Sequence, residues 1–175
     1  RVFSIVFFIM KGKIMTVQYE YDQQLYTLTT DFYNNYPLRS FPELLSPHGN
    51  RTYNCFIIEY KDYFICIPFR TNMRHRNGYH FTTTARSLRA KSGLDYSKMV
   101  IIQDSKYLST SNALVDNDEY IEAIQESERI ISEAVIYLEN YINHNKNIIT
   151  LNPEEYRKKY SYSTLSYFHN ILQIP

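Results

Sequence analysis

Two runs of apolar, β-branched and aromatic residues, separated by Lys61-Asp62, constrain the fold more than any other feature of the chain. The runs cover residues 54–60 and 63–69. A two-residue separation between such runs is the spacing of a β-hairpin. The turn predicts three cross-strand pairs on the face that forms the core: Tyr60 with Tyr63, Ile58 with Ile65, and Phe56 with Ile67. A hairpin of this kind needs further elements to cover it, so it is expected to lie inside a larger domain.

The two cysteines of the chain, Cys55 and Cys66, belong to this hairpin. In the predicted register they lie diagonally on the face opposite the three pairs, too far apart for an easy disulfide. Reduced thiols in a cytosolic protein are therefore expected.

The rest of the chain predicts a mixed α+β fold, with an antiparallel sheet and helices late in the sequence. Before the hairpin we expect an extended segment at 25–30, after a turn at Asp22-Gln23, and an irregular connection at 31–37. Beyond it we expect strands at 79–83, 98–103 and 107–111, a helix at 84–92 between Thr84 and Gly93, a short helix opened by Asn152-Pro153, and a last one over 162–172.

The longest helix is expected near residues 117–143. Asp116 followed by Glu119 has the spacing of a capping box. An apolar stripe at helical spacing follows, formed by Ile121, Ile124, Ile131, Val135, Leu138 and Ile142. The carboxylates of this segment are expected on the outer faces of the helix, in contact with solvent.

The length of 175 residues is that of one domain, since domains average roughly 150 residues. Residues 15–175 are interpreted as that single domain. For residues 1–14 two alternatives stay open: a leader ahead of a start at Met10 or Met15, or an added edge strand. No apolar run approaches the roughly 18 residues of a membrane span.

Charge is balanced overall but divided along the chain. Lys and Arg number 19 against 18 Asp and Glu, a net charge of +1. Between Arg70 and Lys98 the basic residues are opposed only by Asp95, and between Asp116 and Glu139 the acidic residues are opposed only by Arg129. This division suggests two faces with different partners.

The chain holds 18 Tyr, 10 Phe and no Trp. Two explanations stay open. Tyr, Phe, Ile, Asn and Lys are the residues of AT-rich codons, so base composition alone could produce the balance. Tyrosines at a groove could instead stack on nucleic-acid bases.

The densest set of polar groups follows the second strand of the hairpin, where Pro68-Phe69 ends the apolar run. The segment continues with six side chains that can bind an anion or move a proton: Arg70, Thr71, Asn72, Arg74, His75 and Arg76. Arginine binds phosphate through two parallel hydrogen bonds, and a neighbouring hydroxyl can contact the same group. A solvated polar loop is the alternative, and His75 is either a surface histidine or a proton-transfer group. The other histidines lack the spacing of metal ligands, so no metal site is predicted.

The hairpin and its loop carry a resemblance to a known family. The sequence FIIEYKDYFICIPFRTN followed by MRH, with SGLDYSKMVII at 92–102, resembles the toxins of type III toxin–antitoxin systems, the ToxN-like endoribonucleases, and among them the CptN and TenpN branches. In that family a strand ending in proline and a hydrophobic residue precedes a Thr/Ser pair and then a basic residue. Arg70 and Thr71 occupy the pair, so only one hydroxyl is kept, and Arg74 lies one place beyond the expected basic residue. Glu59 and Arg51 match a glutamate of the first strand and the basic residue before it.

The resemblance covers residues 51–103, and it implies a fold and a reaction. The fold would be a compact SH3-like barrel with added helices, similar to the plasmid-toxin ribonucleases. The reaction would be metal-independent and cofactor-free cleavage of RNA, in which a 2′-hydroxyl attacks its neighbouring phosphorus and leaves a 2′,3′-cyclic phosphate. Arg70 and Arg74 would stabilise charge, Thr71 would bond a phosphoryl oxygen, and Arg51 could do either. His75, Tyr19 or Tyr21 would transfer protons.

The resemblance also implies partners. These are a cellular RNA substrate and a folded, repeated antitoxin RNA, with a pseudoknot expected, that fills the site in a closed protein–RNA assembly in the bacterial cytoplasm; neither a membrane nor DNA is expected. Phe81 and Tyr96 would add stacking surfaces. The expected RNA contacts are Asn72, Arg76, Tyr19, Tyr21, Tyr79, Arg86, Arg89, Lys91 and Lys98. A non-catalytic RNA-binding or assembly module on the same barrel is the alternative function, and a merely solvated basic face is the alternative for the basic stretch.

Overall fold

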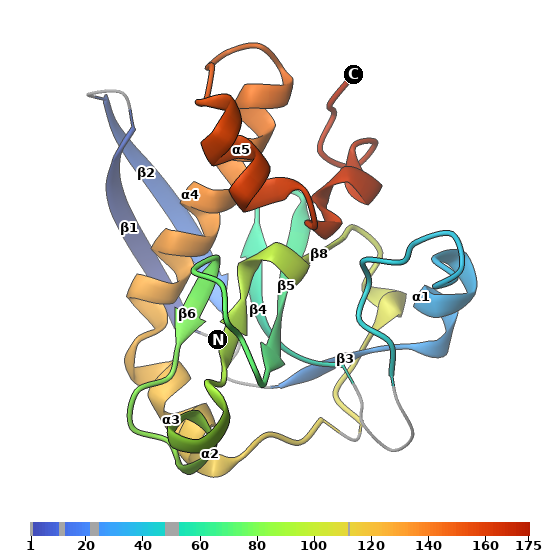
Figure 1. The fold of residues 1–175 in the computed structure, drawn as a ribbon, viewed down its shortest axis with the longest axis vertical. Helices are drawn as coiled ribbons and strands as arrows, with labels where there is room; N and C mark the ends of the chain where they lie inside the picture. Colours follow the sequence, from blue (N-terminus) through green and yellow to red (C-terminus); the bar gives the residue numbers. More distant parts are fainter. Residues whose placement is uncertain (1, 11–12, 22–24, 48–52, 112) are drawn as a thin grey trace.

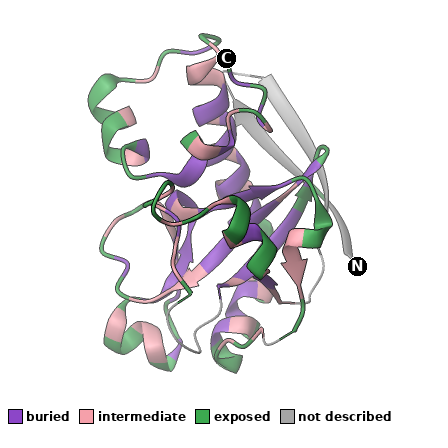
Figure 2. Cartoon of the chain, turned by 90° about the vertical axis from the view of Figure 1, so that its right-hand side faces the viewer, coloured by how far each residue is buried: buried purple, intermediate pink, exposed green. Residues whose placement is uncertain are grey.

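The computed structural model describes the chain except residues 1, 11–12, 22–24, 48–52 and 112, and except the side chains of 2–4, 6–10 and 13–21. The fold is α+β, with an antiparallel sheet on which helix α4 (Ser127–Asn145) lies lengthwise (Figure 1). Burial follows the central strands and α4, whereas the short outer helices are mostly exposed (Figure 2).

The predicted hairpin is confirmed and forms the centre of the sheet. Strands β4 (Asn54–Tyr60) and β5 (Tyr63–Arg70) pair antiparallel in the expected register, from Tyr60 opposite Tyr63 to Phe56 opposite Ile67. Lys61 in the turn has a φ of 55°, as the tight turns that match strand twist require. Both faces are buried, since Ile57 and Cys66 on the other face are as inaccessible as Ile58 and Ile65. Helices and loops therefore cover the hairpin on two sides.

Both cysteines are buried and free. Cys55 lies opposite Pro68 and Cys66 opposite Ile57, which is the diagonal placement that the turn predicted. Burial raises the pKa of the Cys66 thiol well above its ordinary value, so this thiol is held neutral inside the core.

The described strands pair in the order β1-β2-β4-β5-β7-β6, and this path is open. β5 is long enough to take two partners on one edge: its first half pairs with β8 (Val100–Ile102) and its end, at Phe69 and Arg70, pairs with β7 (Gly93–Asp95). The remaining strands are β1 (Val2–Met10), β2 (Lys13–Tyr21), β3 (Tyr26–Leu28), β6 (Gly78–His80) and β9 (Leu108–Ser109). Residues 2–10, for which an edge strand was one alternative, form β1 in a hairpin with β2. The expected turn at Asp22-Gln23 lies outside the described residues.

The long helix is divided in two, so the prediction of one helix is wrong. α3 (Asn117–Gln125) ends at Glu126 and α4 (Ser127–Asn145) begins there. Ile131, Val135 and Leu138 are fully buried, whereas Ile121 is 45% exposed. The apolar stripe therefore belongs to α4. α3 is held instead by its acidic side chains, described below.

Several boundaries differ from the prediction for local reasons. Residues 30–35 form helix α1 (Thr30–Asn35) rather than an irregular connection, because Thr29 Oγ1 accepts the Phe32 amide and Phe32 is fully buried. Thr84 caps α2 (Ala85–Ala90) as expected, but that helix ends at Lys91, which takes the left-handed conformation with φ 50°. Gly93 belongs to β7, where a Cβ would stand 2.1 Å from the Tyr79 carbonyl oxygen.

The carboxyl-terminal elements pack across one end of the sheet (Figure 1). α5 (Pro153–Tyr160) begins as predicted, with the Asn152 side chain accepting the amides of Glu154 and Glu155. The last apolar stripe forms a 3₁₀-helix (Thr164–Phe168) rather than an α-helix; two further 3₁₀ turns lie at Tyr96–Lys98 and Ser105–Tyr107. None of the helices in the described part of the chain combines the length and apolarity that crossing a bilayer requires.

Candidate functional site

The polar loop after β5 is anchored against the end of α2. The Asn72 amide donates to the Ala90 carbonyl (2.6 Å) and the Met73 amide to the Lys91 carbonyl (3.0 Å). Met73 is 1% exposed and serves as the apolar anchor, while Asn72, with a φ of 59°, turns the chain outward. Thr71 is half-buried, and Asn72, Arg74 and Arg76 are exposed. The backbone that carries the expected phosphate-binding side chains is therefore held in place by hydrogen bonds.

The centre of this site is Asp95, a fully buried carboxylate of β7. Its Oδ2 accepts from Arg70 Nη1 at 2.6 Å and lies 3.3 Å from His75 Nε2. Its Oδ1 accepts from the Ser97 amide at 2.9 Å and from Ser97 Oγ at 2.6 Å. Burial opposes ionisation, but the hydrogen bonds from His75, Ser97 and Arg70 outweigh it and lower the pKa of Asp95. Asp95 is therefore an ionised partner that joins Arg70 to His75.

The sequence prediction missed Asp95 as a member of this site. It was noted only as the one acid within the basic stretch 70–98. That isolation was a signal, because a single carboxylate among so many cations is a candidate for a buried ion pair.

Both ring nitrogens of His75 are engaged. Nε2 faces Asp95, and Nδ1 accepts the Asn77 amide at 3.2 Å. The His75 carbonyl also accepts from His80 Nε2 at 2.8 Å. The structure thus gives His75 a role in holding the loop, and a proton-transfer role would require one of these bonds to open.

The free cations of the loop and of the neighbouring end of α2 are the side chains on which phosphate binding would depend. Arg74, Arg76 and Lys91 are exposed, and none has an acidic partner within the described part of the chain. Arg89 is exposed too, and its Nε donates only to the Ala85 carbonyl of its own helix. These four side chains can bind an anion without first breaking an ion pair.

Two other expected RNA contacts are held within the protein. Arg86 makes a paired, fork-like contact with Glu119 and lies 3.6 Å from Asp116. Lys98 bonds Glu43 and donates to the Tyr162 carbonyl at 2.8 Å. For either side chain to contact RNA, an internal ion pair would have to break first.

The expected stacking rings are buried. Tyr79, Phe81 and Tyr96 are each 4% exposed. Tyr79 donates to Glu122 at 3.1 Å and Tyr96 donates to Glu133 at 3.0 Å. These rings pack the core and do not offer a face to a base.

The acidic and basic segments contact each other, so the expectation of two separate charged faces is corrected. Glu122 accepts the amides of Thr82 and Thr83 at 2.9 and 3.2 Å, together with both hydroxyls. Asp118 accepts the Ala85 amide at 2.7 Å, and Glu119 accepts from Ser92 as well as Arg86. Asp116 itself makes no capping bond: the Glu119 amide donates to Asp118 Oδ1 at 2.9 Å, and the Glu119 side chain bonds Arg86 and Ser92. The capping-box prediction is therefore wrong.

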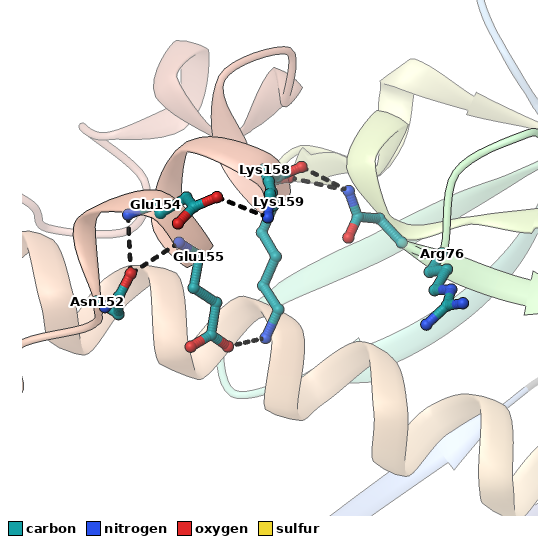
Figure 3. Close-up of a pocket in the computed structure, with 7 residues that line it drawn as sticks. Arg76, Asn152, Glu154, Glu155, Lys158 and Lys159 are labelled. Atoms are coloured by element: carbon teal, nitrogen blue, oxygen red, sulfur yellow. Dashed lines mark hydrogen bonds and ion pairs between the residues drawn. The ribbon is translucent and has the colours of Figure 1, made fainter.

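A hollow of about 410 Å³ lies beside the loop, between Arg76-Asn77 and α5 (Figure 3). Asn77 Nδ2 donates to the carbonyls of Lys158 and Lys159, each at 3.3 Å, and so ties the loop to that helix. The charged side chains of α5 in this hollow are paired with each other, Glu154 with Lys158 and Glu155 with Lys159. Figure 3 shows the Arg76 guanidinium apart from these pairs.

Three expected site residues lie outside the described part of the structure. Arg51 is among the residues not described, and nothing is described of the side chains of Tyr19 and Tyr21. Glu59, matched through the family resemblance, is an exposed residue of β4 opposite Phe64. Its place is apart from the end of β5 where Arg70 and Thr71 lie.

Among the described residues, no three His, Cys, Asp or Glu side chains gather in a way that could hold a metal ion. Comparisons of the chain with protein-family models, with curated proteins and with solved structures found no match. The function is therefore inferred from the geometry of the site and from the resemblance of its motif.

Proposed function

We propose that this protein is a metal-independent endoribonuclease, the toxin of a type III toxin–antitoxin system. One observation carries the proposal: the guanidinium of Arg70 is fixed at the end of β5 by a buried carboxylate, beside the Thr71 hydroxyl and the unpaired cations of the same loop. As part of the proposal, the open sheet is a variant of the compact SH3-like barrel of that family.

The side chains of this loop are of the kinds that the reaction requires for stabilising charge and binding the RNA backbone. Attack of an RNA 2′-hydroxyl on the adjacent phosphorus places negative charge on the phosphoryl oxygens, and fixed hydrogen-bond donors stabilise that charge. Arg70 and Thr71 would contact these oxygens, while Arg74 and Arg76 would bind the phosphates on either side. Holding the backbone in line for attack supplies a further part of the rate. The products are a 2′,3′-cyclic phosphate and a free 5′-hydroxyl.

The antitoxin in this proposal is a folded, repeated RNA that occupies the same cations. Arg89 and Lys91, at the end of α2, extend the positive surface beyond the loop. An RNA bound across these residues would cover Thr71 and keep a substrate out. A closed assembly of protein and RNA in the bacterial cytoplasm follows from the same proposal.

A second candidate is a non-catalytic RNA-binding module, and the hydrogen bonds of His75 favour it. With both ring nitrogens engaged, His75 offers no free group for proton transfer, and a guanidinium is a poor proton donor because its pKa exceeds about 12. Binding would then use the same loop without cleaving the RNA.

Purified protein freed of bound nucleic acid separates the two candidates. We expect it to cleave RNA in excess EDTA and to leave 2′,3′-cyclic phosphate ends. Thr71→Val removes one phosphoryl contact and should lower the cleavage rate about a hundredfold with little loss of stability. Arg74→Ala should weaken cleavage as well, while Arg39→Ala, an exposed arginine beyond α1, should not.

Three outcomes count against the proposal. RNA binding without cleavage would establish the binding module. Neither binding nor cleavage would remove both candidates. Strong inhibition by EDTA would contradict the metal-independent mechanism.

A further inference from the structure

The two carboxylate oxygens of Asp95 have different partners. Oδ1 takes both bonds from Ser97 and so caps the 3₁₀ turn Tyr96–Lys98. Oδ2 faces Arg70 and His75. Oδ1 thus stabilises the 3₁₀ turn, and Oδ2 contacts the loop that holds the candidate site.

The backbone around Asp95 is packed too closely for this arrangement to move freely. Asp95 pairs with Gly78, where an added Cβ would lie 2.4 Å from the Leu94 carbonyl oxygen. The Tyr96 amide donates to the Asn77 carbonyl at 3.0 Å. Asp95 and its neighbour Tyr96 are therefore held by consecutive residues, the last of the loop and the first of β6.

The ion pair with Asp95 orients the Arg70 side chain. Its side chain is 31% exposed, whereas Asp95 is fully buried, so one end of the guanidinium is fixed and another reaches solvent. A guanidinium carries five N–H donors. The bond from Nη1 to Asp95 leaves the others for an anion that approaches from outside. An arginine fixed in advance loses less conformational freedom when it binds charge.

His75 connects Asp95 to the rest of the loop and holds the loop in place. It links Oδ2 to the Asn77 amide through its two ring nitrogens, and Asn77 is bonded in turn to α5. Arg76, between His75 and Asn77, is thereby held beside the hollow in Figure 3.

We propose that Asp95 is the positioning residue of the candidate site: Oδ2 aims Arg70 at the scissile phosphate and fixes the loop through His75, while Oδ1 maintains the fold. The inference rests on the proposed endoribonuclease function. Asp95 contacts no substrate atom in this role. It acts through the orientation of Arg70, so its loss should slow the reaction more than it weakens RNA binding.

Asp95→Asn tests the division between the two oxygens. The amide oxygen can still accept from Ser97, but the amide nitrogen then faces two donors, Arg70 and His75, and releases them. We expect kcat for RNA cleavage to fall at least about tenfold, with KM changed by no more than about twofold. Ser97→Ala is the matched control, because it removes a bond to Oδ1 only. It should lower the thermal midpoint and leave kcat unchanged.

The outcomes are distinct. Wild-type protein that cleaves no RNA overturns the proposed function and this inference with it. Wild-type cleavage together with a folded Asp95→Asn variant of equal kcat overturns the inference alone. If the Asp95→Asn variant does not fold, the His75→Ala variant tests the inference in its place. It keeps the bond from Arg70 to Asp95 and should lower kcat several-fold, and an unchanged kcat would contradict the role given to Oδ2.

Discussion

At the scale of single residues, buried carboxylates shape this protein. Asp95 and Glu119 are fully buried and Glu122 is 6% exposed, and each accepts several hydrogen bonds from the basic segment. A buried charge is costly unless it is paired and hydrogen-bonded. Sequence spacing placed Glu119 and Glu122 on an outer, solvated face. They are buried instead, and donors at residues 79–92 compensate their burial.

Glu122 makes the stability of the protein dependent on pH. Burial raises its pKa, but the bonds from Thr82, Thr83 and Tyr79 outweigh burial and hold the pKa below the ordinary value of 4.5. A lowered pKa adds stability that is present above the unfolded value and is lost as the pH falls through the folded value. We expect the free energy of unfolding to decrease as the pH is lowered below about 4.5. In Glu122→Gln the protein should be less stable near neutral pH, with a smaller further loss on acidification.

Urea denaturation at neutral and acidic pH measures this difference. Glu128→Gln, on the exposed side of α4, is the control and should follow the wild type. An acid loss in Glu122→Gln as large as that of the wild type would count against the role of Glu122.

At the scale of elements, patterns with a strong local cause were predicted well. The β4–β5 hairpin follows from its two-residue turn, and α5 follows from Asn152 and Pro153. The elements that were missed depend on distant contacts. α1 is stabilised by packing of Phe32 against Tyr107. α3 is drawn toward α2 by the bonds of Glu119 and Glu122, and it is separate from α4.

Helix α4 contributes a row of buried side chains to the core. Substitution of one buried and one exposed leucine tests the importance of this helix for stability. Leu138 on α4 is fully buried, whereas Leu88 on α2 is 77% exposed. Leu138→Ala should lower the free energy of unfolding by about 2–5 kcal/mol, since it removes buried methyl groups and leaves a cavity. Leu88→Ala should change it by less than about 0.5 kcal/mol. Denaturant unfolding of the two variants measures the difference, and equal effects would contradict the placement of α4.

At the scale of the whole molecule, net charge is a poor guide to binding. The value of +1 averages cations held in ion pairs with cations left free near the end of β5. Arg86 is paired with Glu119 and Lys98 with Glu43, while Arg74, Arg76 and Lys91 are exposed. Within residues 70–98 the free positive charge is therefore smaller than the sequence suggests and lies around the loop after β5.

RNA binding under the proposed function should respond to salt in proportion to these free cations. For a single strand, the logarithm of the binding constant falls against the logarithm of salt concentration with a slope of about −0.7 per phosphate contacted. Arg76→Ala should reduce the slope by about 0.7, and Arg86→Ala should leave it unchanged because Arg86 is paired with Glu119. Titrations at several salt concentrations measure both slopes. A larger effect at Arg86 than at Arg76 would contradict this account of the surface.

The hairpin, its register, the α+β class and the polar loop that follows β5 could be predicted from the residues alone, because these features depend on neighbours within a few residues. Which charges stay free depends on how distant segments pack. Whether Arg86 contacts solvent or Glu119, and whether Asp95 contacts Arg70, depends on how segments from 25 to 33 residues apart pack together. Buried polar groups are costly unless they are paired, so packing determines which of these charges are partners.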